Sequence, residues 1–217
     1  MPLDILYLDD WIVAIDKPAG YLVHPAEKPQ EGDLVAMKIL RDQIGKRVYN
    51  IHRIDRPTTG VVVFGIDRGA ARELHAAWQR HEVAKTYWAV VAGEPPAAQW
   101  ECREPIRKSD TSPAQEAHTT FRVRERNDGL ALIEATPHTG RFHQIRRHLL
   151  HAGIPIVGDF RYAGEEESFR LCAQWGLGTR MLLQARQVAL RHPVTGEHLS
   201  ISAPVDPLFA RCFPRSL

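Results

Sequence analysis

Short β-strand patterns separated by tight turns dominate this sequence. Residues 5–8 and 11–15 are apolar runs on either side of Asp9-Asp10, and so short a connection can join only antiparallel strands. The same pattern recurs around Asn127-Asp128-Gly129. The chain is therefore expected to build a mostly antiparallel sheet. The expected strands are residues 5–8, 11–15, 60–66, 86–92, 119–124, 130–135, 182–190 and 199–202.

Other segments carry the spacing of amphipathic helices. Asp33 is placed to cap a helix that runs through Ile44 and ends at Gly45. Two more helices are expected over residues 68–82 and 144–152. Because the helices interrupt the strands irregularly, the pattern favours an α+β fold over a doubly wound parallel sheet.

The length of 217 residues allows one large domain or two modest ones. We expect a single domain over residues 1–217, with a weak seam near 95–112 and a surface insertion at 161–180. The longest apolar run, near 61–66, is far shorter than the ~18 residues of a membrane span, so no membrane is expected as a partner. Three widely spaced cysteines indicate free thiols in a reducing, cytoplasmic setting.

The densest polar cluster is the run His52-Arg53-Ile54-Asp55-Arg56-Pro57-Thr58-Thr59-Gly60, directly before a predicted strand. A carboxylate between two arginines is held in its ionised form. One interpretation is a catalytic Asp55 on a rigid loop. The other is an ion pair that only anchors the strand, since structural pairs perturb carboxylates in the same way.

A second cluster, residues 139–148, surrounds the start of a predicted helix and is rich in Arg and His. Helix N-termini attract phosphate, so the cluster could contact phosphates and bases; it could equally be the solvated face of an amphipathic helix. The net charge of +2 is not by itself a nucleic-acid signature. Arg does outnumber Lys by 22 to 6, and the guanidinium grips phosphate with a planar fork.

Two further patterns admit alternatives. His143, His148 and His151 invite a metal site, but no carboxylate or thiol partners complete a ligand set, so no metal is expected. Tyr87 and Trp88 point to opposite faces of one strand. One of them is expected in the core, and the other could stack on a base.

Taken together, these segments resemble the RluA-type family of RNA pseudouridine synthases. The run 52–60 is similar to the family's catalytic motif, His-Arg-Leu-Asp-x-x-Thr-Ser-Gly, with Ile54 and Thr59 as conservative departures. Four more motifs follow the family's order. They are Lys17-Pro18-Ala19-Gly20, Lys85-Thr86-Tyr87, Gly140-Arg141-Phe142-His143-Gln144-Ile145-Arg146 and Pro155-Ile156-Val157-Gly158-Asp159.

The resemblance implies roles for individual residues. Asp55 would be the catalytic aspartate, Arg146 its ion-pair partner, and Tyr87 the ring that stacks on the target uracil. Arg53 would fill the gap left by the flipped nucleotide. The expected RNA contacts are Arg53, Arg56, Arg141, His143, Arg147 and Lys17.

The resemblance also implies an α+β fold with a long mixed sheet, flanking helices and a central cleft, without an S4-type domain before Lys17. The implied reaction isomerises a uridine of RNA after base flipping and uses neither cofactor nor metal. The segments 41–45 and 176–183 are most similar to small members that modify uridine 65 of tRNA. Gln184, where the family usually has His, cannot titrate.

Other functions stay open at this point. A small relative of dual or ribosomal-RNA specificity is the main rival. A non-catalytic RNA-binding module would have no need of Asp55, Tyr87 and Arg146 together, and a metal-dependent phosphodiesterase would depend on the His cluster. We expect the protein to act as a monomer.

Overall fold

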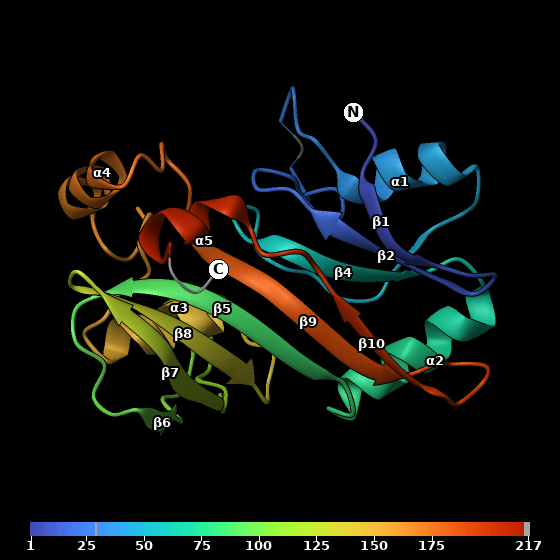
Figure 1. Ribbon diagram of the computed structural model, residues 1–217. Helices are drawn as coiled ribbons and strands as arrows, with labels where there is room; N and C mark the ends of the chain where they lie inside the picture. The colour runs from blue at the N-terminus through green and yellow to red at the C-terminus, as the bar shows by residue number, and fades with distance from the viewer. Residues whose placement is uncertain (29, 215–217) are drawn as a thin grey trace. The chain divides into compact units, whose positions relative to one another are not determined.

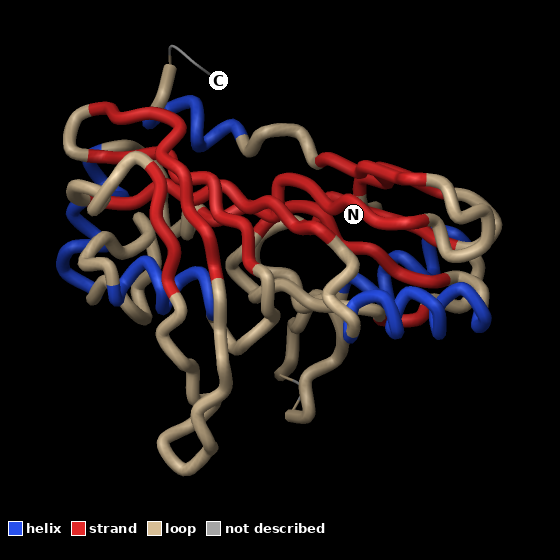
Figure 2. Tube along the Cα trace, turned by 90° about the horizontal axis from the view of Figure 1, so that it is seen from below, coloured by secondary structure: helices blue, strands red, loops and turns tan. Residues whose placement is uncertain are grey.

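The computed structural model describes residues 1–28 and 30–214, which divide into two compact units. Unit 1 comprises residues 1–85 and 185–204, and unit 2 comprises the described residues of 86–184 and 205–217. In both units strands make up more of the regular structure than helices do (Figure 2). Residues 95–112 lie inside unit 2, so the seam predicted there is wrong: the Pro and charged residues mark a surface connection, not a boundary.

Unit 1 is built on a sheet whose first three strands in spatial order pair antiparallel (Figure 1). Its strands follow the order β1-β2-β4-β9, while β10 pairs with β9 and β3 pairs with β4. The elements are β1 (Asp4–Leu8), β2 (Ile12–Lys17), α1 (Ala36–Ile44), β3 (Tyr49–Asn50), β4 (Thr59–Gly65), α2 (Arg68–Gln79), most of β9 (Leu183–Arg191) and β10 (His198–Ser202).

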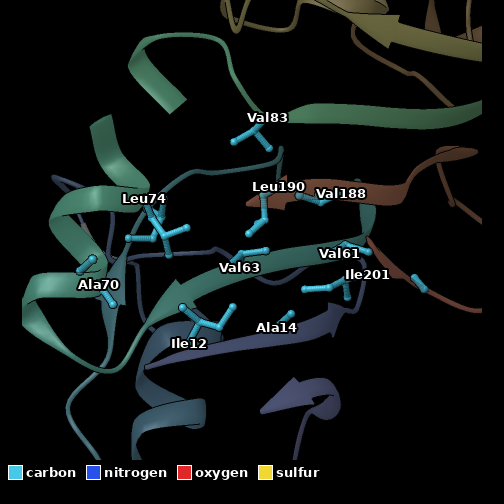
Figure 3. Close-up of a cluster of buried hydrophobic side chains, with 13 residues drawn as sticks. Ile12, Ala14, Val61, Val63, Ala70, Leu74, Val83, Val188, Leu190 and Ile201 are labelled. Carbon is cyan, nitrogen blue, oxygen red and sulfur yellow. The ribbon is translucent and has the colours of Figure 1, made fainter. Parts of the chain in front are cut away.

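One face of this sheet packs against α2. Ile12 and Ala14 of β2 and Val61 and Val63 of β4 alternate with residues of the opposite face and meet Leu74 of the helix (Figure 3). The helix begins where sequence predicted, because the Asp67 side chain accepts a hydrogen bond from the Ala70 N–H at 2.8 Å.

Helix α1 begins later than predicted. Its N-cap is Val35, and Asp33 makes no cap. The Asp33 carboxylate instead accepts a hydrogen bond from the Gln30 N–H at 2.9 Å and pairs with Arg56 at 3.1 Å. The predicted cap is therefore wrong, because the Asp33 carboxylate binds Arg56 in a tertiary ion pair instead of the N–H groups at the start of the helix.

Unit 2 holds a second antiparallel arrangement, in the order β5-β8-β7-β6. The hairpin of β7 and β8 turns at Asp128 and Gly129, which both have positive φ, as predicted for this turn. The elements are β5 (Ala84–Ala92, whose first two residues belong to unit 1), β6 (Gln99–Cys102), β7 (Thr119–Asn127), β8 (Leu130–Pro137), α3 (Gln144–His151), α4 (Glu165–Gln174) and α5 (Pro207–Cys212).

Both faces of the unit 2 sheet are covered. Ile145 and Leu149 of α3 pack against one face, where Ala89 and Val91 of β5 point. Val90 points to the other face, which is covered by residues of α4 and α5. A sheet covered on two sides explains why the second half of β5, residues 88–92, is apolar on both faces of the strand.

The segment 161–180 is not the surface insertion that was predicted. It contains α4, and it buries Leu171, Cys172 and Leu177 in the core on the second face of the sheet. The Glu run at 165–167 and the surrounding glycines hid this helix, since the acidic residues occupy its first turn, where they suit the helix dipole.

The expected α+β fold and mostly antiparallel sheet are confirmed. All three cysteines are free, as predicted, and all three are buried. Among residues 1–28 and 30–214, no helix is long and apolar enough to cross a membrane.

We expect Gly60→Ala to destabilise the protein far more than Gly129→Ala. Both glycines have positive φ, so either substitution strains the backbone by about 1–2 kcal/mol. A Cβ at Gly60 would also be forced into the backbone carbonyl of Ala185, whereas nothing lies within 4 Å of a Cβ at Gly129. Overpacking adds roughly 1–3 kcal/mol. Urea unfolding of the two variants measures the difference, and equal losses would contradict the close approach at Gly60.

Candidate active site

Two buried isoleucines anchor the segment of unit 1 that leads into the Asp55 loop. Ile51 and Ile54 are each 6% exposed, whereas Arg53 and Arg56 point outward and Asp55 is half-buried. The Thr58 N–H donates to the Asp55 carbonyl at 3.0 Å, which closes a tight turn over Arg56 and Pro57. Thr59 then begins β4. The loop therefore has one conformation imposed from both ends, as its Pro and Gly content predicted.

Lys17 binds the backbone of this loop through its buried ammonium. Its side chain is 0% exposed, and its ammonium donates to the carbonyls of Pro18 (2.7 Å), Tyr21 (2.9 Å) and Arg56 (3.2 Å). The Gly20 N–H donates to the same Arg56 carbonyl at 2.8 Å. Lys17 was expected to contact RNA. The structure shows its ammonium buried and bonded to backbone carbonyls that join the 17–21 turn to the Asp55 loop, and its contact with RNA stays a prediction.

Arg56 completes the clasp that Lys17 forms on the loop. Its Nε donates to the Gly20 carbonyl at 2.9 Å, and its Nη1 lies 3.1 Å from Asp33. Arg53 is less constrained: it is exposed, and its Nη1 lies 3.5 Å from Nε2 of His24. Of the two arginines beside Asp55, Arg53 is thus the one whose guanidinium can turn toward a ligand at small cost.

His52 is a neutral structural residue. Its Nε2 accepts a hydrogen bond from the Val63 N–H at 2.9 Å, so the proton is assigned to Nδ1, and its ring stacks on Trp78 at 4.6 Å. Burial, reinforced by the charge of Lys85, lowers the pKa of His52 to about 3. His52 therefore ties the start of the Asp55 loop to the middle of β4.

The second set of predicted site residues lies in unit 2, around the start of α3. The Gln144 side chain, which is 4% exposed, binds the surrounding backbone and side chains. Its amide nitrogen donates to the His118 carbonyl and to the Thr119 hydroxyl, at 2.9 Å each. Its amide oxygen accepts from the Thr139 hydroxyl at 2.7 Å and from the Arg141 N–H at 2.9 Å. The sequence left open whether residues 139–148 form a nucleic-acid contact surface or the solvated face of an amphipathic helix. In the structure Gln144 is a buried hub that shapes residues 139–144.

Arg146 is buried in this unit and bound to a carboxylate. Its Nε and Nη2 donate to the two oxygens of Asp159 at 2.8 Å each, and the two side chains are nearly inaccessible to solvent. This bidentate pair occupies one edge of the guanidinium and does not involve Nη1. The sequence did not reveal Asp159 as a partner of Arg146, although Asp159 is the last residue of the family motif Pro155–Asp159. The expected pairing of Arg146 with Asp55 stays a prediction.

The remaining polar residues of the cluster are held by the backbone around them. Arg141 Nε donates to the Glu116 carbonyl at 2.9 Å, and Arg147 Nη1 donates to the Arg107 carbonyl at 2.6 Å. His143 is the N-cap of α3, with a φ of +53°. Its ring stacks on Phe142 at 3.7 Å, and its Nδ1 bonds to the Tyr162 hydroxyl at 2.9 Å.

His148 does not point to a metal. Its Nε2 bonds to the Glu104 carbonyl at 3.0 Å, its Nδ1 bonds to the Thr119 hydroxyl at 2.9 Å, and burial lowers its pKa. Within the described ranges, 1–28 and 30–214, no group of three or more His, Cys, Asp or Glu side chains is arranged to hold a metal ion.

Tyr87 lies in β5 opposite Ala135 of β8 and packs, half-buried, against the apolar cluster that α3 covers. Trp88 faces the opposite cluster and lies under the Arg124 guanidinium at 4.8 Å. The opposed orientation predicted for these rings is confirmed.

Comparison with known proteins identifies the family. Residues 11–151 match the family described as RNA pseudouridylate synthase. The chain belongs to the RNA pseudouridylate synthase family. A tRNA pseudouridine synthase C of Salmonella typhi is 36% identical over 94% of this chain and 86% of the relative, and that of Haemophilus ducreyi is 37% identical over 95% and 92%.

Solved structures agree. The human RNA pseudouridylate synthase domain containing 4 superposes with a TM-score of 0.79 at 26% identity, covering 98% of this chain and 92% of the human one. Human RNA pseudouridylate synthase domain containing 1 has the same fold, with a TM-score of 0.77. The protein is thus an RNA pseudouridine synthase, an enzyme that isomerises uridine in RNA, and the resemblance seen in its sequence is confirmed.

One departure from the family pattern has a structural explanation in this pseudouridine synthase. Gln184 is 1% exposed, and its Oε1 accepts a hydrogen bond from the Asp206 N–H at 3.3 Å. Asp206 caps α5 through the Leu208 N–H and also pairs with Arg180. A neutral amide at position 184 therefore helps fix the start of the C-terminal helix.

We expect Lys17→Met to destabilise this synthase by about 3 kcal/mol or more, because it leaves carbonyls without their charged donor in a buried place. Turnover should fall as well, because the Arg56 carbonyl, which directly follows Asp55, loses the hydrogen bond that fixes its position. Lys38→Met, at an exposed position of α1, should change stability by less than about 0.5 kcal/mol. Thermal unfolding and turnover of both variants test this, and an equally small effect at Lys17 would refute the clasp.

The pKa of His52 predicts a loss of stability in acid. The folded pKa of about 3 lies below the unfolded value near 6.5, so the stabilisation is complete above pH 6.5 and declines as the pH falls toward 3. The decline from this group is about 1.4 kcal/mol per pH unit at most. His52→Gln keeps an acceptor for the Val63 N–H and removes the titration.

Urea unfolding between pH 7.5 and 5 checks this expectation. The His52→Gln variant should lose roughly 1–2 kcal/mol less than the wild type over that range. His75→Gln, at an exposed position of α2, serves as the control and should follow the wild-type curve. Parallel curves for all three proteins would show that His52 does not titrate as proposed.

Proposed function

We propose that this enzyme converts one specific uridine of tRNA, uridine 65, to pseudouridine. The observation that carries the proposal is the similarity to tRNA pseudouridine synthase C, which extends over 94% of this chain and 86% of the Salmonella typhi relative. The site of action is the cytoplasm, and the active form is the monomer.

Asp55 is the proposed catalytic group. The reaction breaks the N1–C1′ bond of the uridine, turns the base, joins C5 to C1′, and exchanges the C5 proton for one on N1. An ionised carboxylate can attack as a nucleophile or remove a proton. The clasp by Lys17 and the buried Ile54 support this role, because a group that acts on a flipped base must be held within a few tenths of an ångström.

Arg146, Tyr87 and Arg53 are proposed to complete the site. Arg146 keeps Asp55 ionised, Tyr87 stacks on the target uracil, and Arg53 occupies the space that the flipped nucleotide leaves in the RNA. The outward position of Arg53 and its weak 3.5 Å contact to His24 suit a side chain that must enter the RNA.

Arg56, Arg141, Arg147 and His143 are proposed to contact the RNA backbone. Each of these arginines already donates to a backbone carbonyl, which orders the guanidinium before RNA binds. Pre-ordered donors lose less conformational entropy on binding. The isomerisation changes no oxidation state and consumes no energy source, so it is proposed to proceed without cofactor or metal.

Tritium release from C5-labelled uridine in tRNA transcripts tests this function. We expect release from one uridine of a folded tRNA in the presence of EDTA. Asp55→Asn should abolish release and leave tRNA affinity within several-fold of wild type, because it removes a charge but little volume. Asp10→Asn, at an exposed turn, should behave as wild type. Release from ribosomal-RNA fragments alone would refute the tRNA target, and near-normal turnover of Asp55→Asn would refute its catalytic role.

A further inference from the structure

We propose that Tyr162 is a positioning residue that holds the guanidinium of Arg146 in its working orientation. The inference deepens the proposed function and rests on it, because it takes Arg146 as the partner of the catalytic aspartate. Tyr162 was not among the site residues expected from the sequence. Its ring lies against the Arg146 guanidinium, and the Arg146 Cζ is 5.0 Å from the ring centroid.

The ion pair with Asp159 holds only one edge of Arg146. Two parallel hydrogen bonds of 2.8 Å fix the guanidinium along its Nε–Nη2 edge. Hydrogen bonds in the plane of a guanidinium do not by themselves block its tilting out of that plane. An aromatic ring against its face restricts that tilt, and the cation is attracted to the ring as well. At 5% exposure of Arg146, little water competes with either contact.

Asp159 and Tyr162 are delivered together by one turn of the chain. The N–H groups of Tyr162 and Ala163 donate to the Asp159 carbonyl at 3.0 and 2.8 Å. The carboxylate that holds the edge of Arg146 and the ring that holds its face thus belong to one rigid segment, so the two restraints move as a unit.

The Tyr162 hydroxyl has a separate partner. It bonds to Nδ1 of His143 at 2.9 Å, and the two rings meet edge to face at 5.7 Å. His143 has a φ of +53°, which is rare for a residue other than glycine and must be held by its surroundings. The ring of Tyr162 therefore packs against Arg146, and its hydroxyl bonds to His143.

This division predicts different kinetic effects for two substitutions. Tyr162→Leu removes ring and hydroxyl and should lower kcat about tenfold, the loss expected for a desolvated cation–π contact, and should raise KM. Tyr162→Phe keeps the ring and should restore kcat, while KM stays raised because His143 loses its partner. A merely structural residue would not separate kcat from KM in this way.

A double-mutant cycle shows whether Tyr162 acts through Arg146. In an Arg146→Lys background, where no planar fork remains to be positioned, Tyr162→Leu should cost no further kcat. Phe169→Ala is the matched control, because it removes an exposed aromatic ring of the neighbouring helix α4 and should leave kcat unchanged. Urea midpoints of all variants ensure that kcat is measured on folded protein.

The outcomes are distinguishable. A wild-type kcat for Tyr162→Leu, or a full tenfold loss added to that of Arg146→Lys, would overturn the positioning role of Tyr162 and leave the proposed function intact. A wild-type kcat for Arg146→Ala would overturn the proposed role of Arg146 and the positioning role with it. A fall in kcat that Tyr162→Phe restores, and that vanishes in the Arg146→Lys background, would support both.

Discussion

The buried ammonium of Lys17 is the interaction on which the Asp55 loop depends. A charge without solvent must be neutralised or fully hydrogen-bonded, and Lys17 meets that demand with backbone carbonyls from its own turn and from Arg56. The need to satisfy this charge brings two segments together that are far apart in sequence. Gly60, which pairs with Lys17 across β2 and β4, then lets the chain enter β4 directly beneath the loop.

Unit 2 meets the same need with different chemistry. Gln144, rather than a charge, gathers the backbone of residues 118–141, and the pair of Arg146 and Asp159 is the buried charge that must be satisfied. Breaking a buried ion pair costs more than the pair contributes, because the remaining partner is left unneutralised. Such groups are retained because they fix geometry, and here they fix a guanidinium that the proposed chemistry requires in one orientation.

These networks suit an enzyme that isomerises uridine in RNA. A pseudouridine synthase rearranges its substrate with no external reactant, so its rate depends on how firmly the base, the sugar and the carboxylate are held. In both units the side chains nearest to the proposed chemistry are tied to backbone atoms or to buried partners. The arginines proposed to meet RNA are ordered in the same way, on the protein surface.

The sequence by itself determined the hairpins, the α+β class, the free cysteines and the family. Each depends on local pattern: alternation and turn residues for the hairpins, and ordered motifs such as 52–60 and 140–146 for the family. Only the tertiary structure decided which polar residues face inward. Lys17, expected at the RNA, is buried; Asp33, expected to cap a helix, pairs with Arg56; and segment 161–180, expected on the surface, enters a core. Asp159 and Tyr162 were not recognised as partners of Arg146. For the polar residues the physical reason is the same: a polar side chain takes the partner that satisfies it most completely, and that partner is brought near by folding rather than by proximity in sequence. Segment 161–180 enters a core because Leu171, Cys172 and Leu177 are buried there, while the acidic run before them conceals this in the sequence.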